Sequence, residues 1–239
     1  MYRNLILVIA AACMAAACTS HNTLTRQEKA DGWVLLFDGK TTEGWRNFNS
    51  EDRELAWHVV DGCLQANGVG DDANGYIVTE KEYENFILSW DWKLSKGGNS
   101  GMLYHVVEGP RFNVPYVTGP EYQLIDVEGW EEANAPTKLE EWQKIGVDYA
   151  MYLPDQSKMK VNPHGEWNNS MIVFDNGHVE HWLNGVKLVQ YERGTQQWNA
   201  LVAYSKYKNW PNFGNRDGRI LLQDHGDEVW FKNIKIKEL

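Results

Sequence analysis

Carboxylate, amide and imidazole side chains occur within short runs of strand-forming residues, where they could transfer protons or bind hydroxyl groups. Glu121 and Gln123 alternate with apolar residues, so the two point to one side of their strand. By the same alternation His105 shares a face with Gly101 and Leu103 on the preceding run. A carboxylate and an imidazole on one open sheet face suit general acid–base catalysis. For Glu121 the alternative is a charged residue on a solvated face.

Five further polar residues stand near the ends of such runs, and each has a chemical and a structural interpretation. Glu166, at the return from a long connection, could act as an acid or base or could fix the loop. Asn99 and Ser100 could bond to hydroxyl groups of a ligand or to the backbone at a strand entrance, and Asn168 has the same two interpretations. Asp126 lies near a strand end. We take Glu166 as a catalytic candidate and the other four as substrate-binding candidates.

The 12 Trp and 11 Tyr residues bear on the kind of ligand, because aromatic faces stack on the C–H surfaces of sugars. Most of the tryptophans fall in strand-like runs and are expected in the core. Trp130, Trp142 and Trp210 lie in connections and could form a ligand platform or pack a loop. We include Trp142 among the substrate-binding candidates.

Runs rich in aromatic and β-branched residues, separated by Gly, Asn and Asp, dominate the chain from residue 30 to 239. Within 85–94 large apolar residues recur with a period of two, which indicates a strand with one buried face. Asn-Gly pairs at 176–177 and 184–185 predict hairpin turns. The expected strands are 34–37, 56–60, 75–79, 85–94, 100–107, 121–127, 167–174, 178–183, 186–191, 219–222 and 229–237.

One stretch, 136–144, has a helical pattern, and it lies inside a connection from Glu128 to Gly165 that is rich in Pro, Asn and Asp. Connections of this length are usually functional or lid-like. Regular strands without alternating helices predict an all-β fold, in which two antiparallel sheets pack as a jelly-roll sandwich.

The N-terminus has the pattern of a secretory signal, with the basic Arg3, an apolar run and small residues. Residues 14–18, Met-Ala-Ala-Ala-Cys, are similar to a bacterial lipobox, which implies lipidation of Cys18; an ordinary cleaved signal is the alternative. We expect an exported protein anchored by its lipid to a membrane, the outer membrane at its periplasmic or surface face. The expected organisation is a signal peptide at 1–17, a lipidated cysteine and solvated tether at 18–29, and one domain at 30–239.

Loss of residues 1–17 would leave 22 basic and 33 acidic residues, a net charge of −11. Such a surface repels phosphate backbones, so we expect no nucleic-acid partner. Cys63 would then be the lone thiol besides the lipidated Cys18, so no intramolecular disulfide is expected. We expect Cys63 to be a small buried residue, and the sequence makes no prediction of oligomeric state.

Nine segments between Gly32 and Leu239 form an ordered set of motifs. They are 36–40 with Gly44-Trp45, 57–64 (WHVVDGCL), 79–86 (TEKEYENF), 99–102 (NSGM), 121–126 (EYQLID), 165–168 (GEWN), 181–185 (HWLNG), 222–226 (LQDHG) and 229–239. In these segments the chain resembles the 3-keto-disaccharide hydrolase domain family, which implies a concanavalin A-like or laminarinase-like jelly roll. A resemblance of this kind transfers chemistry only as far as the site residues match.

The resemblance implies cleavage of glycosides that are oxidised at C3 of the sugar. A ketone at C3 acidifies the C2 hydrogen, so removal of that proton can expel the C1 substituent. The reaction needs a base, an electrophile or metal at the enolate oxygen, and an acid for the leaving group. Glu121 is the leading base, and Gln123 and Gln223 join the substrate-binding candidates. Family members often carry Arg where this chain has His105, so no role is carried over to His105.

His181 and His225 are the other imidazoles within these segments. A single histidine on a strand is more often structural. Together with Glu121 and His105, they supply nitrogen and oxygen donors for a divalent metal ion. No compact ligand spacing is present, so only the number of available donor side chains supports this possible metal site.

Two other functions compete with an enzyme that cleaves 3-keto-glycosides by elimination or hydrolysis. One is a non-catalytic carbohydrate-binding lipoprotein of the same fold. The other is a retaining glucanase of the laminarinase type, which needs two carboxylates on one strand face. Gln123 stands where that pattern requires an acid, which disfavours the glucanase.

Overall fold

Two antiparallel β-sheets pack face to face in this computed structural model, which describes residues 21–51, 54–68, 75–210, 213–214 and 217–239. The strands of the larger sheet are β1 (Trp33–Leu35), β3 (Trp57–Val60), β4 (Cys63–Asn67), β6 (Phe86–Leu94), β9 (Asn168–Asp175), β10 (His178–Leu183), β11 (Val186–Glu192) and β13 (Glu228–Glu238). Those of the smaller sheet are β2 (Trp45–Asn47), β5 (Ile77–Thr79), β7 (Asn99–Val106), β8 (Glu121–Ile125) and β12 (Arg219–Leu222).

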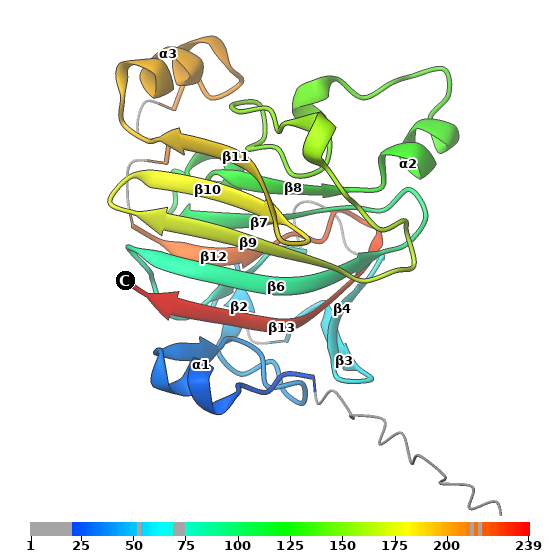
Figure 1. Ribbon diagram of the computed structural model, residues 1–239, viewed down its shortest axis with the longest axis vertical. Coiled ribbons are helices and arrows are strands. Elements are labelled where there is room, and N and C mark those ends of the chain that lie inside the picture. The colour runs from blue at the N-terminus through cyan, green and yellow to red at the C-terminus, as the bar shows by residue number, and fades with distance from the viewer. Residues whose placement is uncertain (1–20, 52–53, 69–74, 211–212, 215–216) are drawn as a thin grey trace, which may run out of the picture.

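The strand order in the larger sheet is β11-β10-β9-β6-β13-β4-β3, with β1 also paired to β13, and in the smaller sheet it is β2-β5-β12-β7-β8. Figure 1 shows the two layers, one behind the other. Strands that are neighbours in a sheet are often distant in the sequence, as in a jelly roll. The expectation of an all-β, two-sheet antiparallel sandwich is confirmed.

Apolar side chains that alternate along the strands fill the space between the sheets. In β6, Phe86, Leu88 and Trp90 are fully buried, whereas Asp91 and Lys93 on the other face are partly exposed. Each large side chain that is removed from water in this way stabilises the fold by about 1.5–3 kcal/mol. The predicted alternation in this segment therefore separates the residues that pack in the core from those on the outer face.

Cys63 is buried and its thiol is free, as expected from the sequence. Burial raises the pKa of this thiol above its ordinary value, although the charges of Lys232 and Lys93 oppose the shift. A buried, protonated thiol is a poor nucleophile, so Cys63 acts as a small core residue.

The helices differ from the sequence expectation. The stretch 136–144 contains only a 3₁₀ turn, because Leu139 is drawn into the main core while its neighbours stay irregular. A longer helix, α3, forms instead after β11, where Trp198 and Val202 bury one side and Thr195 caps the first turn. The helices and turns are α1 (Arg26–Ala30), η1 (Pro115–Val117), α2 (Val127–Ala133), η2 (Glu141–Gln143), η3 (Gln156–Lys158) and α3 (Gln196–Tyr204).

The long connection after β8 covers the free edge of that strand. Gly146 donates its backbone N–H to the carbonyl of Gln123 (2.9 Å), and Tyr149 donates to that of Glu121 (3.0 Å). Residues 145–149 thus continue the antiparallel pairing, and Asp148 lies opposite Tyr122. An edge strand whose free hydrogen-bonding groups are paired in this way is protected from other chains. The pairing also places Tyr149 beside Glu121.

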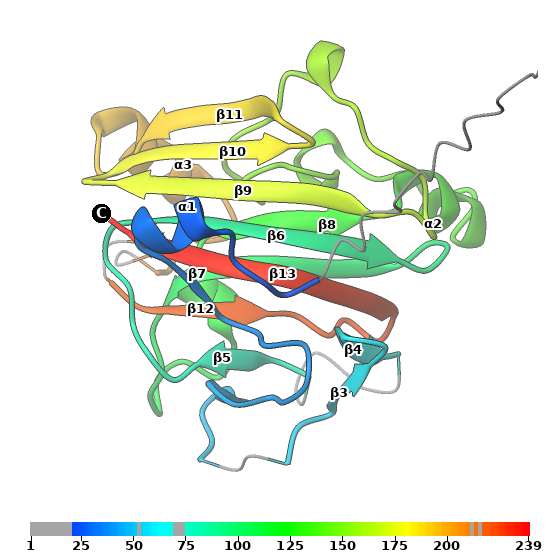
Figure 2. The same cartoon turned by 60° about the horizontal axis from the view of Figure 1, so that its bottom comes forward.

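The N-terminal segment packs on the outer face of the larger sheet, where α1 lies over β13 and β6 (Figure 2). Asn22 is buried, and it exchanges hydrogen bonds with Asn233 and donates to the carbonyl of Gly62. Asn22 therefore holds the start of the described chain on the sheet, whereas most of the residues from 23 to 30 are exposed to solvent. The expected signal peptide and Cys18 lie outside the described residues. Within the described part, no helix is long and apolar enough to cross a bilayer.

Candidate active site

A polar pocket of 210 Å³ lies on the outward face of the smaller sheet. Glu121 and Gln123 point into it, while Tyr122 and Leu124 between and beyond them are buried between the sheets. The expected alternation along β8 is therefore observed. The pocket is lined by Tyr76, Asn99, Tyr116, Glu121, Gln123, Tyr149, Lys206, Gln223 and His225.

Glu121, Gln123 and Gln223 are buried at the floor of the pocket. The Nε2 group of Gln123 donates to Oδ1 of Asn99 (3.3 Å) and to the carbonyl of Gln143 (3.2 Å), which orients its amide. The Oε1 atoms of Gln123 and Gln223 have no hydrogen-bond partner within the described part of the chain. A buried acceptor without a partner costs about 1–3 kcal/mol. Hydroxyl groups of a ligand could satisfy both.

A glycine gives the Glu121 carboxylate its room. Gly101 lies opposite Gln123 on the neighbouring strand β7. A Cβ atom at position 101 would lie 2.5 Å from Oε1 of Glu121, closer than real Cβ contacts come. The carboxylate therefore rests directly against the backbone of β7.

The rim of the pocket carries a lysine among aromatic rings. The Nζ atom of Lys206 lies 4.2 Å from the ring centre of Tyr149, 4.7 Å from that of Tyr116 and 5.3 Å from that of Tyr207. Such contacts stabilise the charged ammonium form. Sequence reasoning did not select Lys206, Tyr116 or Tyr149, because they belong to three separate connections and no motif spacing marks them.

The prediction that His105 faces the pocket is wrong, because β7 contains a bulge. Leu103 pairs with Leu221 and Val106 pairs with Arg219, so β7 has one more residue than β12 over the same span. His105 has a positive φ of 54°. The extra residue reverses the alternation, and the His105 side chain turns into the core.

In the core, His105 packs against Phe174, with 4.3 Å between ring centres, and is fully buried. Nε2 lies 2.9 Å from the carbonyl of Glu84, and Nδ1 lies 3.0 Å from Nη1 of Arg193. Because Arg193 is always a donor, Nδ1 accepts and Nε2–H donates. Burial and the charge of Arg193 lower the pKa of His105 to about 3. His105 is a neutral structural residue, neither base nor ligand of the pocket.

His181 is also buried between the sheets, with Nε2 at 3.3 Å from the hydroxyl of Tyr104, and burial lowers its pKa to about 3. Of the four donors expected to bind a divalent metal, only Glu121 and His225 line the pocket. Among the residues that the structure describes, no three His, Cys, Asp or Glu side chains come together as a metal site. The expected ligand set of Glu121, His105, His181 and His225 therefore does not converge.

A second carboxyl group, Asp148, is fully buried behind the strand of Glu121. Burial raises its pKa to about 7, and the charge of Glu121 adds to this, while the nearby Tyr191 hydroxyl and Glu121 backbone oppose it. The Tyr191 hydroxyl lies 2.9 Å from that of Tyr104, which reaches His181. Tyr191, Tyr104 and His181 thus form a row of polar side chains in the core, whereas both carboxyl oxygens of Asp148 lack a hydrogen-bond partner within the described part of the chain.

Two of the substrate-binding candidates are structural. Ser100 is fully buried, and its hydroxyl donates to the carbonyl of Gln223 (2.6 Å), which holds the backbone beside the pocket floor. Asn168 is buried and exchanges hydrogen bonds with the backbone of Asn162. Neither side chain lines the pocket.

Three other candidates have different positions. Glu166 is exposed and is not part of the pocket lining. Asp126 accepts a hydrogen bond from the backbone of Gly97 (2.8 Å) and lines a separate cavity at the end of the sandwich. Trp142 is partly exposed, with its ring edge-on to that of Tyr149 at 5.2 Å. Trp142 is therefore next to the rim residue Tyr149 but is not part of the pocket lining.

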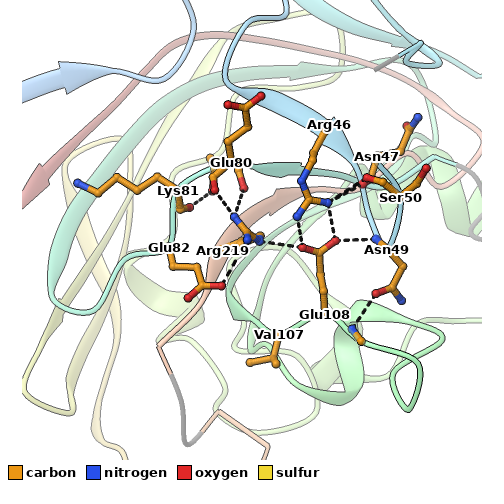
Figure 3. A network of polar contacts seen from close by, with 12 residues as sticks. Arg46, Asn47, Asn49, Ser50, Glu80, Lys81, Glu82, Val107, Glu108 and Arg219 are labelled. Carbon is orange, nitrogen blue, oxygen red and sulfur yellow. Dashed lines mark hydrogen bonds and ion pairs between the residues drawn. The ribbon is translucent and has the colours of Figure 1, made fainter. Parts of the chain in front are cut away.

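A network around Glu108 closes one end of the sheet face that carries the pocket (Figure 3). Its carboxylate accepts from Nη1 of Arg46 (2.8 Å), Nε of Arg219 (2.7 Å) and the backbone of Asn49 (2.6 Å). Burial alone raises the pKa of Glu108, but the hydrogen bonds from Arg46 and Asn49 and the charges of both arginines outweigh it and lower the pKa. Glu108 is therefore held as an anion between two guanidinium groups.

The same network joins the two loops that border the pocket. Asn49 donates to the carbonyl of Phe112 (2.6 Å) and accepts from the backbone of Gly109 (2.9 Å). The first loop carries Phe48, whose ring lies edge-on to that of Tyr76 at 6.4 Å. The second loop leads to Tyr116 at the rim. The Glu108 network thus supports the tyrosine side of the pocket.

These features define a class of protein, a jelly-roll sandwich with a polar pocket on the outer face of one sheet. The profile of the 3-keto-alpha-glucoside-1,2-lyase-like domain matches residues 32–237, and the chain belongs to that family.

Three similar proteins are described as hydrolases, two of them provisionally. A 3-keto-disaccharide hydrolase of Bacteroides thetaiotaomicron is 35% identical over 234 residues, covering 88% of this chain and 79% of that protein. A crystal structure from Parabacteroides distasonis, provisionally described as a glycosyl hydrolase, is 45% identical with a TM-score of 0.83, covering 92% of this chain and 100% of the other. A second from the same organism, with the same provisional description, is 27% identical with a TM-score of 0.63, covering 87% and 99%.

Proposed function

We propose that this protein cleaves the glycosidic bond of 3-keto-glycosides, such as 3-keto-disaccharides. The carrying observation is a buried carboxylate, Glu121, at the floor of a pocket that also offers two unpaired amide oxygens. Family membership and the Bacteroides relative named as a 3-keto-disaccharide hydrolase support the substrate class. A hexose ring presents hydroxyl donors along its edge, which the amide oxygens of Gln123 and Gln223 would accept.

The first step is removal of the C2 proton by Glu121. The C3 ketone makes this proton acidic, and the resulting electron pair is delocalised onto the ketone oxygen as an enolate. Collapse of the enolate forms the C1–C2 double bond and breaks the bond between C1 and the leaving oxygen. That oxygen takes up a proton, so the products are an alcohol or sugar and an unsaturated 3-keto sugar. Addition of one water across the new double bond completes hydrolysis.

Lys206 is the candidate electrophile for the enolate oxygen. A fixed ammonium near developing negative charge stabilises a transition state more than the neutral ground state. The aromatic rings around Nζ hold the group at the rim, facing the same pocket as Glu121. Tyr149 and His225, also at the rim, are candidate donors of the proton to the leaving oxygen.

Turnover of a 3-keto-disaccharide by the full chain, followed by mass spectrometry, tests the proposal. Product mass separates hydrolysis from elimination, and deuterium uptake at C2 in heavy water reports proton removal. A parallel reaction with chelator tests a metal requirement. We expect Glu121→Gln to lose turnover with its fold intact, and Glu166→Gln, an exposed acid outside the pocket, to keep it. Full activity of Glu121→Gln would remove Glu121 as the base.

A non-catalytic carbohydrate-binding role is the alternative. The unpaired acceptors on the pocket floor fit this role as well, because they bind hydroxyl groups whether or not a bond is broken. Binding of the 3-keto-disaccharide without any product would favour it. A two-carboxylate glucanase mechanism has less support, because Glu121 is the single carboxylate among the described residues that line the pocket.

We further propose that the protein is exported and anchored to a membrane through Cys18. The apolar run and the Met-Ala-Ala-Ala-Cys motif support this. Partition of the full chain into detergent, and a lipid mass on the N-terminal peptide, would be lost in Cys18→Ser. Detergent partition that persists in this variant would contradict lipidation at Cys18.

A further inference from the structure

A second cavity, larger than the pocket of Glu121, lies where β8 and β6 end. Its volume is 460 Å³, within the range of small-molecule sites. The buried side chains of Trp92, Leu94, Ile125 and Ile145 form its apolar wall. The cavity lining does not include Glu121, Lys206 or the two glutamines of the pocket floor. The proposed chemistry therefore does not use this cavity.

The two cavities are neighbours along one strand. Gln123 lines the pocket, and Ile125, two residues further along β8, lines the second cavity and belongs to the main core. Residues two apart on a strand face are separated by about 7 Å. In the edge segment, Tyr149 lines the pocket and Ile145, four residues earlier, lines the second cavity.

The rim of the second cavity carries polar groups that suit a sugar. Asp126, Glu128, Asn162 and His164 line it together with the apolar wall. Nδ1 of His164 lies 3.1 Å from Oδ2 of Asp126, so these two side chains form one side of the opening. A neutral sugar ring has an apolar C–H face and a hydroxyl edge, and a site with an apolar wall and several hydrogen-bonding groups matches both.

The small size of the Glu121 pocket favours a second site for the rest of the substrate. Its 210 Å³ is less than the volume of usual small-molecule sites, which begin at about 300 Å³. One oxidised ring would occupy such a pocket, which leaves the other ring of a disaccharide to bind outside it. The second cavity is the adjoining space along β8.

We infer that the second cavity binds the leaving-group sugar of a 3-keto-disaccharide. The inference rests on the proposed function, and it assigns Asp126 to leaving-group recognition rather than to the oxidised ring. It predicts that the enzyme discriminates between leaving groups at this cavity and not at the pocket of Glu121.

Two substrates that share the oxidised ring test the inference: a 3-keto-disaccharide and the methyl 3-keto-glucoside. Val161→Trp would fill the cavity from its exposed rim, and Leu153→Trp, at an exposed site in the same connection outside the cavity, is the matched control. We expect Val161→Trp to lower kcat/KM for the disaccharide on the order of tenfold or more. The methyl glycoside should be turned over unchanged, and Leu153→Trp should alter neither substrate.

A second variant probes the same cavity without adding volume. Glu128→Ala removes an exposed hydrogen-bonding group from the rim, and it should also affect the disaccharide selectively. Equal effects on both substrates, or no effect of Val161→Trp and Glu128→Ala on either, would overturn the inference. Absence of turnover of both substrates by the unaltered protein would instead overturn the proposed function, and this inference with it.

Discussion

The Glu121 carboxylate lies against the backbone of Gly101, so close that a Cβ atom there would be 2.5 Å from Oε1. Gly101→Ala should move the carboxylate, which is the end of a flexible side chain, rather than the strand. We expect little change in melting temperature but a loss of kcat/KM of about 10²-fold, the usual effect of misplacing a reacting group by about 1 Å. In the Glu121→Gln background the same substitution should cause no further loss. A full additional loss there would show that Gly101 acts elsewhere.

Lys206 provides a second prediction, because its ammonium group faces the pocket from within an aromatic cluster. Lys206→Met keeps the length and removes the charge, and it should lower kcat by about 10²–10³-fold, as loss of one oxyanion-stabilising group does. Lys206→Arg should recover part of the rate. Lys208→Met, two residues away and outside the pocket lining, is the control. A rise in KM with unchanged kcat would assign Lys206 to binding only.

The two buried histidines predict how stability depends on pH. His105 and His181 have pKa values of about 3 in the fold, against an ordinary value of 6.5, so the unfolded chain binds more protons between these limits. Stability should therefore fall as pH falls from 6.5 towards 3, by up to about 1.4 kcal/mol per pH unit for each histidine. Denaturant unfolding at a series of pH values measures this. In His105→Gln the slope of the unfolding free energy against pH should be smaller by the contribution of one proton, about 1.4 kcal/mol per pH unit.

Asp148 acts in the opposite direction. Its pKa is raised from 3.8 to about 7, so the folded chain binds the extra proton between these limits. Its contribution to stability is present at low pH and is lost as pH rises through 7. Asp148→Asn should therefore gain stability relative to the unaltered protein as pH rises from 4 to 8, by several kcal/mol. A stability difference between the two proteins that is independent of pH would contradict the shifted pKa.

Glu108 lies between Arg46 and Arg219, and its removal would leave two guanidinium groups close together (Figure 3). Glu108→Ala should cost about 3–5 kcal/mol of unfolding free energy, the usual effect of removing one partner of a buried pair. Glu82→Ala removes an exposed carboxylate that also contacts Arg219, at 3.4 Å, and it should cost less than about 1 kcal/mol. Equal costs for the two variants would show that the Glu108 network is not a structural support.

Sequence alone was sufficient for the elements whose signal is local. The alternation in 85–94 predicted the buried face of β6, and Asn-Gly at 176–177 and 184–185 predicted the turns between β9, β10 and β11. Side chains on a strand alternate regardless of its partners, so Glu121 and Gln123 could be placed together on one face. The same rule failed at His105, because a bulge adds a residue whose presence depends on pairing with β12.

The remaining site residues were decided by tertiary structure. Lys206 follows α3, Tyr149 lies in the edge segment and Tyr76 precedes β5, so only the packing of distant loops on the smaller sheet brings them together. The alternation along β10 places His181 with Val179 and Leu183 on the buried face, whereas the approach of the Tyr104 hydroxyl to its ring depends on the packing of the two sheets. Local patterns thus determined the strands and the orientation of Glu121, whereas long-range packing determined which side chains surround its carboxylate.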